Sequence, residues 1–235
     1  MGKDEAKLPS RSTRAEVADF LTKVKSMPAV RPAGAVGRLI FAMDATASRE
    51  PTWDRACRIQ GEMFSATQGL GGLEIQLVWY RGFGEFDASP WFANSQDLVK
   101  RMTGVTCRGG ETQIAKVLRH AIAETKRRKV NATVFVGDCV EEPVDRLCQL
   151  AGELGLLGVP AFVFHEGGEP VARRCLEEIA RLTHGVYCPF DASSADMLRD
   201  LLAAAAAFAA GGRAALEDFG RRRGGAALRL THQMR

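Results

Sequence analysis

The sequence lacks several features that would identify its class at once. It contains six cysteines, but no two form a C-x-x-C pair and none has the spacing of zinc ligands, so a structural zinc site is not indicated. The longest apolar run, residues 201–212, is shorter than the roughly twenty residues that a membrane-spanning helix needs. The N-terminal charges precede no apolar stretch of the kind found in secretory signals. We therefore expect a cytoplasmic protein with reduced cysteines and no membrane partner.

Excess positive charge is confined to the C-terminal end. The formal net charge is +4, and residues 213–235 hold six arginines against Glu217 and Asp218, a difference of four, so the remaining 212 residues sum to zero. Any attraction to nucleic acid would come from this tail. One basic triplet, residues 221–223, without interleaved aromatic residues is weak support for nucleic-acid binding. We do not expect a nucleic-acid partner for the rest of the chain.

What the sequence does contain is typical of a soluble globular protein. Apolar residues make up 46% and charged residues 26% of the 235 positions, enough for one well-buried core. We predict an N-terminal helix and linker at residues 1–35, one domain at 36–210 and a basic C-terminal tail at 211–235. The helix is expected near residues 13–27, where a capping box precedes apolar residues at helical spacing. The Ala-, Gly- and Arg-rich usage favours a bacterial source.

Apolar segments with little alternation are separated by segments with helical periodicity. This order predicts an α/β fold, with a doubly wound, mostly parallel central sheet flanked by helices and one antiparallel edge strand. Strands are expected at 38–44, 73–80, 132–138, 160–165 and 185–188, with a hairpin edge at 83–93. Helices are expected at 52–68, 95–103, 112–128, 143–157, 170–182 and 194–210.

Polar oxygen donors stand at the ends of two predicted strands and at the start of one helix. Asp44, Thr46 and Ser48 follow the first strand, Thr112 opens the helix at 112–128, and Asp138 ends the strand at 132–138. Each segment alone is explained by ordinary turn and helix-cap chemistry. Ligands of such folds, however, bind at the carboxyl ends of the strands where strand order reverses. Together the five donors suit a hard divalent cation such as Mg²⁺, which prefers oxygen ligands.

These residues resemble the metal-ion-dependent adhesion site (MIDAS) of the von Willebrand factor A (VWA) domains. That motif places D-x-S-x-S after the first strand, a threonine before a central helix and an aspartate at the end of the fourth strand. The matching residues here are Asp44-Ala45-Thr46-Ala47-Ser48, Thr112 and Asp138. The resemblance covers roughly residues 36–205. It departs at Thr46, which replaces serine but keeps the hydroxyl, and at Cys139, where many members have glycine.

The resemblance implies a protein-interaction module rather than an enzyme. Thr46, Ser48 and Thr112 would bind Mg²⁺ or Mn²⁺ through their hydroxyls, and Asp44 and Asp138 would bind it directly or through water. A partner protein would supply a further carboxylate. Intracellular members work in complexes, some of them beside ATPases or chaperones, which gives the class of partner that the resemblance implies.

Residues near the motif have simpler interpretations. Arg108 and Glu111, which flank Thr112 in the sequence, are predicted to contact the partner. Glu141 and Glu142 are interpreted as acids at the start of a helix, and Gly82-Phe83-Gly84 as a hairpin turn. Trp79 and Tyr80 are expected to pack in the core; they would surround the metal, with Arg81 and Phe83, only if the end of the second strand reaches it. His165 is expected to be structural.

Two other functions stay open from the sequence. A phosphate or ester hydrolase could use Asp44 as its nucleophile, but the related phosphatases need a second aspartate two residues later, where this chain has Thr46. Binding of nucleic acid through the basic tail is the other alternative.

Overall fold

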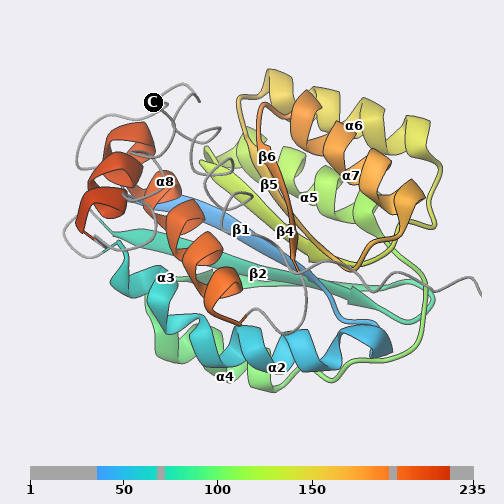
Figure 1. Cartoon of the computed structure of the whole chain (residues 1–235), viewed down its shortest axis with the longest axis horizontal. Helices are drawn as coiled ribbons and strands as arrows, with labels where there is room; N and C mark the ends of the chain where they lie inside the picture. Colours follow the sequence, from blue (N-terminus) through green and yellow to red (C-terminus); the bar gives the residue numbers. More distant parts are fainter. Residues whose placement is uncertain (1–35, 68–71, 191–194, 223–235) are drawn as a thin grey trace, which may run out of the picture.

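The computed structural model describes residues 36–67, 72–190 and 195–222. At its centre lies a six-stranded sheet of order β3-β2-β1-β4-β5-β6 (Figure 1). Every neighbouring pair is parallel except β2 and β3, which form an antiparallel hairpin at one edge. The predicted fold class is confirmed. The strands are β1 (Gly37–Asp44), β2 (Leu73–Arg81), β3 (Glu85–Phe92), β4 (Ala132–Gly137), β5 (Ala161–Glu166) and β6 (Val186–Phe190).

Helices cover both faces of the sheet, as Figure 1 shows. One face packs against α5, α6 and α7, and the other against α2, α3, α4 and α8. The helices are η1 (Ala47–Arg49), α2 (Glu50–Ile59), α3 (Gly61–Ser65), α4 (Ser95–Thr103), α5 (Ile114–Arg127), α6 (Val144–Leu156), α7 (Pro170–Leu182) and α8 (Ala195–Arg222). None of the helices in the described part of the chain combines the length and apolar character that crossing a membrane requires.

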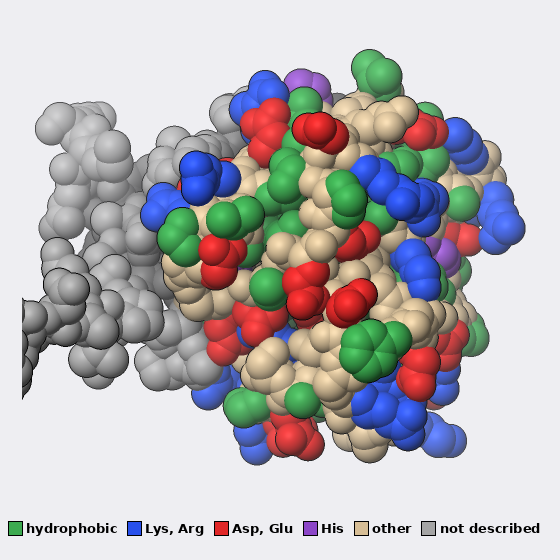
Figure 2. Space-filling view, turned by 90° about the vertical axis from the view of Figure 1, so that its right-hand side faces the viewer, with side chains coloured by type: hydrophobic (Ala, Val, Ile, Leu, Met, Phe, Trp, Pro, Cys, Tyr) green, Lys and Arg blue, Asp and Glu red, His purple; other side chains and the backbone are tan. Residues whose placement is uncertain are grey.

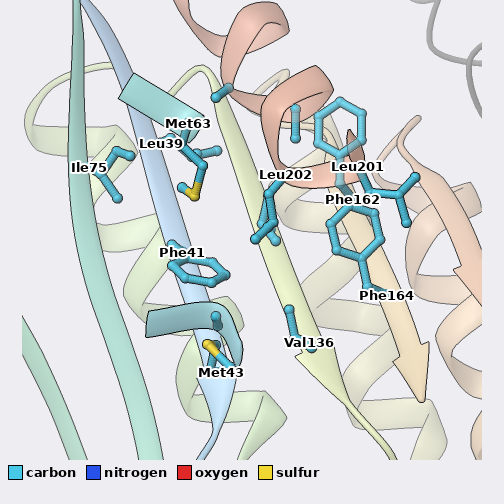
Figure 3. Packing of buried hydrophobic residues seen from close by; sticks show 14 of the residues in the cluster. Leu39, Phe41, Met43, Met63, Ile75, Val136, Phe162, Phe164, Leu201 and Leu202 are labelled. Carbon is cyan, nitrogen blue, oxygen red and sulfur yellow. The ribbon is translucent and has the colours of Figure 1, made fainter. Parts of the chain in front are cut away.

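Burial on both faces explains why the central strands read as continuous apolar runs. All eight residues of β1 are buried, and successive side chains point to opposite faces. Leu39, Phe41 and Met43 face the core beneath α2, α3 and α8 (Figure 3), whereas Ile40 and Ala42 face α5 and α6. A Cβ atom at Gly37 would lie 2.4 Å from the Ala209 carbonyl oxygen. The absence of a side chain there lets α8 approach the start of β1.

One predicted helix is divided in the structure, and a second helical segment follows another. The helix expected at 52–68 is divided at Gln60 into α2 and α3. The helix expected to end near residue 210 does end there: Gly212 has non-helical backbone angles (φ 67°, ψ −158°), and a second helical segment, included in α8, follows to Arg222. Phe219 beyond this break packs against the core. The predicted domain boundary at 210 lies next to this break, and the helix predicted near 13–27 lies outside the described residues.

A cluster of charged residues, here called the amino-end cluster, surrounds the start of β1. The Arg38 guanidinium lies 3.7 Å from the ring centroid of Trp91 and donates to Glu124 Oε2 at 3.2 Å and to the Arg128 carbonyl at 2.6 Å. Glu74 Oε2 lies 3.5 Å from Arg38 Nε and 3.0 Å from Arg128 Nη1. Trp91 Nε1 also donates to Glu124 Oε2, at 3.0 Å. Arg127 Nη1 lies 3.0 Å from Glu124 Oε1, so three arginines pair with two glutamates in this cluster.

Candidate metal centre

The two predicted site aspartates lie at the carboxyl ends of neighbouring strands. Asp44 ends β1 and Asp138 directly follows β4, and these strands pair with each other in the sheet. The chain passes from β1 toward one edge of the sheet and returns at β4 on the other side, so strand order reverses between them. The Ser48 hydroxyl donates to Asp138 Oδ2 at 2.9 Å and so joins the two loops. Acidic side chains gather near the centre of this end of the molecule in Figure 2.

The loop after β1 is a tight turn that brings its oxygen atoms together. The backbone N–H of Thr46 donates to Asp44 Oδ1 at 2.7 Å, and the hydroxyls of Thr46 and Ser48 lie 3.3 Å apart. A short 3₁₀ turn then leads into α2, whose first turn contains Pro51, a residue suited to that position. The hydrogen bonds that form this turn therefore also bring together the side-chain oxygens of Asp44, Thr46 and Ser48.

Thr112 joins these residues from a third segment. Its side chain is buried, and its Oγ1 accepts a hydrogen bond from the backbone N–H of Glu141 at 2.9 Å. The backbone N–H of Thr112 in turn donates to Glu141 Oε2 at 2.8 Å. This reciprocal pair fixes the Thr112 hydroxyl relative to the loop that carries Asp138.

All five predicted metal ligands line one open hollow of about 210 Å³. Arg108 and Glu111, predicted to contact the partner, do not line it. Both are exposed; Arg108 Nη1 lies 3.3 Å from Glu85 Oε1, and the Glu111 N–H donates to the Gly82 carbonyl at 3.2 Å. The hollow is lined by Asp44, Thr46, Ala47, Ser48, Gly109, Gly110, Thr112, Asp138, Cys139 and Glu141.

The environment of Asp44 disfavours its charge. Burial raises the pKa of the Asp44 carboxyl; hydrogen bonds from Thr46 oppose this rise, and the neighbouring charge of Asp138 adds to it. The Tyr80 hydroxyl donates to Asp44 Oδ2 at 3.1 Å. Tyr80 was expected to pack in the core, and although it is fully buried, its hydroxyl also serves the site. A cation in the hollow would relieve the repulsion between the two aspartates.

A buried arginine lies beside the site. Arg49 is 1% exposed and pairs with Glu166 at the end of β5, and Glu166 also accepts a hydrogen bond from Thr52. Burial lowers the pKa of the Arg49 guanidinium, and the charges of Asp138 and Asp44 oppose that shift. Glu166, Asp138 and Asp44 thus share one guanidinium, so the formal charge of this group is negative. Nothing local in the sequence distinguishes Arg49 from a surface arginine.

Three other residues near the hollow have supporting roles. His165 Nε2 lies 3.1 Å from the Asp138 carbonyl and Nδ1 lies 2.8 Å from the Tyr187 hydroxyl, consistent with its predicted structural role. Glu142, predicted as a helix-start acid of its own helix, instead accepts from the backbone N–H groups of Ile114 and Ala115 in the first turn of α5. Burial and the charge of Glu141 raise the pKa of the Cys139 thiol, so the thiolate is disfavoured.

The donor set fits a hard cation. Within the described residues, no three side chains among His, Cys, Asp and Glu are arranged to hold a metal ion between them. The hollow instead offers two carboxylates and three hydroxyls, from Asp44, Asp138, Thr46, Ser48 and Thr112. Such oxygen donors suit Mg²⁺ or Mn²⁺ better than a soft metal, and the open side leaves room for water or another ligand.

Comparison with known proteins identifies the fold. No protein-family model matches the sequence, and no curated protein matches it. The VWA domain of SpRpn10 superposes with a TM-score of 0.56 at 13% identity, covering 72% of this chain and 94% of that one. An aerotolerance-related membrane protein from Bacteroides fragilis gives 0.56 at 14% identity, covering 72% and 98%.

A third structure is proximal thread matrix protein 1 from the mussel byssus, described with its MIDAS motif occupied by zinc. It gives a TM-score of 0.54 at 16% identity and covers 75% of this chain and 49% of that one. Likeness at such identities concerns the fold and does not carry over binding properties. The chain has the fold of the von Willebrand factor A domains.

Proposed function

We propose that the protein is a metal-dependent interaction module that uses Mg²⁺ or Mn²⁺ to bind an acidic side chain of a partner protein. The observation that carries the proposal is the convergence of five oxygen-bearing side chains, from three separate segments, on one open hollow. Zinc in the MIDAS motif of a protein with the same fold supports a divalent ion at this position. We propose no catalytic activity for the chain itself.

In this proposal the hydroxyls of Thr46, Ser48 and Thr112 and the carboxylates of Asp44 and Asp138 hold the ion, directly or through water. The bound ion supplies a Lewis-acidic position that an incoming carboxylate can fill. The chain's own hydrogen bonds do the positioning: Thr46 N–H fixes Asp44, Ser48 fixes Asp138, and Glu141 fixes Thr112. Oxygen donors and a protonated Cys139 favour Mg²⁺ or Mn²⁺ over zinc.

Glu141 is proposed to contribute to metal affinity without being one of the five ligands. Its carboxylate lines the hollow, with Oε2 held by the Thr112 N–H. Mg²⁺ usually keeps several of its waters in proteins, and a carboxylate at the rim can accept hydrogen bonds from them. Such outer partners commonly change metal affinity by about 10–100-fold.

The partner surface is proposed to include Arg108 and Glu111, both exposed on the loop that precedes Thr112. Arg108 can pair with a carboxylate of the partner through a charge-assisted hydrogen bond. We place the protein in the cytoplasm, of a bacterial cell by its composition, and propose a partner within an ATPase or chaperone complex. The family resemblance supports this class of partner.

Thermal melting tests the metal site. Saturating Mg²⁺ or Mn²⁺ is expected to raise the Tm of the wild-type protein, because an ion that binds only the folded state stabilises it. Asp44→Ala, Thr112→Ala and Asp138→Ala are each expected to remove the shift. Asp54→Asn is the matched control, since Asp54 is exposed on α2 and does not line the hollow. A wild-type melting curve that saturating metal leaves unchanged contradicts the proposal.

The partner claim needs a separate measurement. Immobilised full chain is incubated with extract of its source cell in Mg²⁺ or in EDTA, with the Asp44→Ala variant in parallel. Proteins retained by the wild type in Mg²⁺, and lost both with EDTA and with the variant, are the expected partners. Retention that ignores both EDTA and the substitution contradicts metal-dependent binding.

A further inference from the structure

The turn between β2 and β3 presents an aromatic ring beside the metal centre. Among the large hydrophobic side chains that are exposed in the described residues, Phe83 is the aromatic one, and it is 86% exposed. A free phenyl ring in water is unfavourable. Exposed aromatic residues are also enriched at the centres of protein interfaces. The position of Phe83 next to a candidate binding site therefore calls for an explanation.

The backbone on both sides of Phe83 adopts conformations that favour glycine. Gly82 has φ of 58° and Gly84 has φ of 128°, values that residues with a Cβ atom rarely adopt. The turn therefore has a specific shape set by two glycines. Phe83 is the side chain that this shape projects outward.

The segment that leads to Thr112 clamps this turn from one side. A Cβ atom at Gly110 would lie 2.2 Å from the Gly82 carbonyl oxygen, so the two backbones are in close contact. The Glu111 N–H donates to the same carbonyl at 3.2 Å. Gly110 also lines the hollow, which places the base of the turn against the wall of the metal centre.

The side chains of Gln113 and Lys116, just after Thr112, hold the rest of the turn. Lys116 Nζ donates to the Gly84 carbonyl at 2.9 Å and to Gln113 Oε1 at 2.7 Å. Gln113 Nε2 donates to the Arg81 carbonyl at 3.2 Å. The backbone around Phe83 is thus fixed at both ends while its ring contacts solvent. Because this backbone is already ordered, a partner that covers the ring restricts only the side-chain torsions of Phe83.

One carboxylate, that of Glu85, pairs with both arginines around Phe83, which leaves one positive charge in excess. Glu85 Oε2 lies 2.5 Å from Arg81 Nε, and Glu85 Oε1 lies 3.3 Å from Arg108 Nη1. Arg81 also donates to the Thr106 hydroxyl at 2.8 Å. The β2–β3 turn offers a partner an apolar contact at Phe83. The hollow beside it instead contains the carboxylates of Asp44 and Asp138. Figure 2 shows an exposed hydrophobic side chain next to the central acidic group.

We infer that the partner is recognised through two neighbouring features of one segment: an acidic residue that reaches the metal ion and an apolar side chain that packs on Phe83. This inference rests on the proposed function and specifies the partner's chemistry. The metal contact supplies the requirement for a carboxylate. The aromatic contact discriminates among the many acidic segments of a cell, since an acidic residue alone is a common surface feature.

Selection from a library of random peptides tests the inference. The full chain is immobilised and the library is selected in Mg²⁺ and, in parallel, in EDTA. Peptides enriched by the wild type in Mg²⁺ are expected to combine Asp or Glu with a nearby aromatic or long aliphatic residue. Selection on Phe83→Ala is expected to keep the acidic residue and lose the apolar one.

Affinity measurements with one enriched peptide complete the test. Phe83→Ala is expected to weaken binding about tenfold, consistent with loss of an aromatic anchor, and Phe83→Trp to restore it. Leu156→Ala is the matched control, because Leu156 is 92% exposed at the carboxyl end of α6, and it should leave affinity unchanged. The Mg²⁺-induced rise in Tm should be the same in all four proteins.

The outcomes separate the two proposals. If acidic peptides are enriched only in Mg²⁺ but carry no apolar preference, or if Phe83→Ala binds as tightly as the wild type, the inference about Phe83 is wrong and the metal-dependent function stands. If Mg²⁺ enriches no acidic peptide at all, both are wrong.

Discussion

The two ends of β1 differ in how they treat charge. At the amino end, Arg38, Arg127 and Arg128 are paired with Glu74 and Glu124. At the carboxyl end, Asp44 and Asp138 converge on an open hollow, and the nearby Arg49 is already paired with Glu166. Buried charges that are paired need no further ligand. Carboxylates that converge without a matching cation leave a position for one, and this difference distinguishes a structural cluster from a candidate binding site.

The largest effect is expected from breaking the amino-end cluster. Arg38→Ala removes the buried cation that pairs with the buried Glu124 carboxylate, together with the contact with Trp91. It should lower the free energy of unfolding by about 3–5 kcal/mol, measured by urea denaturation in EDTA. Arg127→Ala is the control, because Arg127 contacts the same carboxylate at 3.0 Å but is 79% exposed, and should cost at most about 1 kcal/mol. Equal losses for the two variants would contradict the assignment of a structural role to Arg38.

The opposite result is expected at the carboxyl end. Asp44→Asn should weaken Mg²⁺ binding at least about 100-fold, or about 2.7 kcal/mol, measured by calorimetric titration. In EDTA the variant should be as stable as the wild type or more so, because burial and Asp138 disfavour the charge that the substitution removes. A marked loss of stability without metal would show that Asp44 serves the fold rather than the site.

The two clusters should also respond to pH in opposite directions. The pKa of Asp44 is raised above its ordinary 3.8 by burial. Its contribution to stability is therefore present below the ordinary pKa and is lost as pH rises through the raised one. For Glu124, burial acts to raise the pKa, but the Trp91 hydrogen bond and the charges of His120 and Arg38 bring it below the ordinary 4.5. Its contribution is present above pH 4.5 and is lost as pH falls through the lowered pKa.

Urea denaturation in EDTA between pH 3 and pH 8 separates these contributions. The stability of the wild type relative to Asp44→Asn should fall as pH rises, and its stability relative to Glu124→Gln should fall as pH drops. Parallel pH dependences for the two variants would contradict the contrast between the clusters.

The smallest predicted effect concerns Glu141. Glu141→Gln keeps a carbonyl oxygen that can accept from the Thr112 N–H but removes the negative charge from the rim. Mg²⁺ affinity should fall about tenfold without loss of stability in EDTA. Glu111→Gln removes an exposed charge from the neighbouring segment that does not line the hollow, and should change affinity less than about twofold. If both variants lose the same Mg²⁺ affinity, Glu141 acts only through its negative charge and not through a specific contact at the hollow.

Much of the fold could be predicted because the sheet is buried on both faces. Strands such as β1 are continuous apolar runs, because side chains on both faces of the sheet are buried. The helices between them show apolar residues at clear helical spacing. Where the prediction differed, local signals were ambiguous. The pair Gly211-Gly212 indicated the end of a helix, and Gly212 does interrupt α8, but nothing in the sequence predicted the second helical segment beyond it. The division at Gln60 leaves helical backbone on both sides, so no strong breaker marks it.

The site residues that lie at the ends of strands could be predicted from the sequence. Asp44 and Asp138 are placed by β1 and β4 alone, since parallel strands bring their carboxyl ends to one edge. Tyr80 was missed as a site residue because it lies in an apolar strand; only the register, which pairs Asp44 with Tyr80, brings its hydroxyl to the carboxylate. The contact between Thr112 and Glu141 joins residues 29 positions apart, and no local pattern encodes it.

The hydrogen bond from Ser48 to Asp138 spans 90 positions of the chain and has a consequence for folding kinetics. It can form only after β1 and β4 have paired, so a partly folded chain that lacks this pairing has no complete site. An ion that recognises the joined loops would therefore stabilise the native state more than the transition state. Metal should then slow unfolding while leaving the folding rate nearly unchanged, and so lengthen the lifetime of the folded domain.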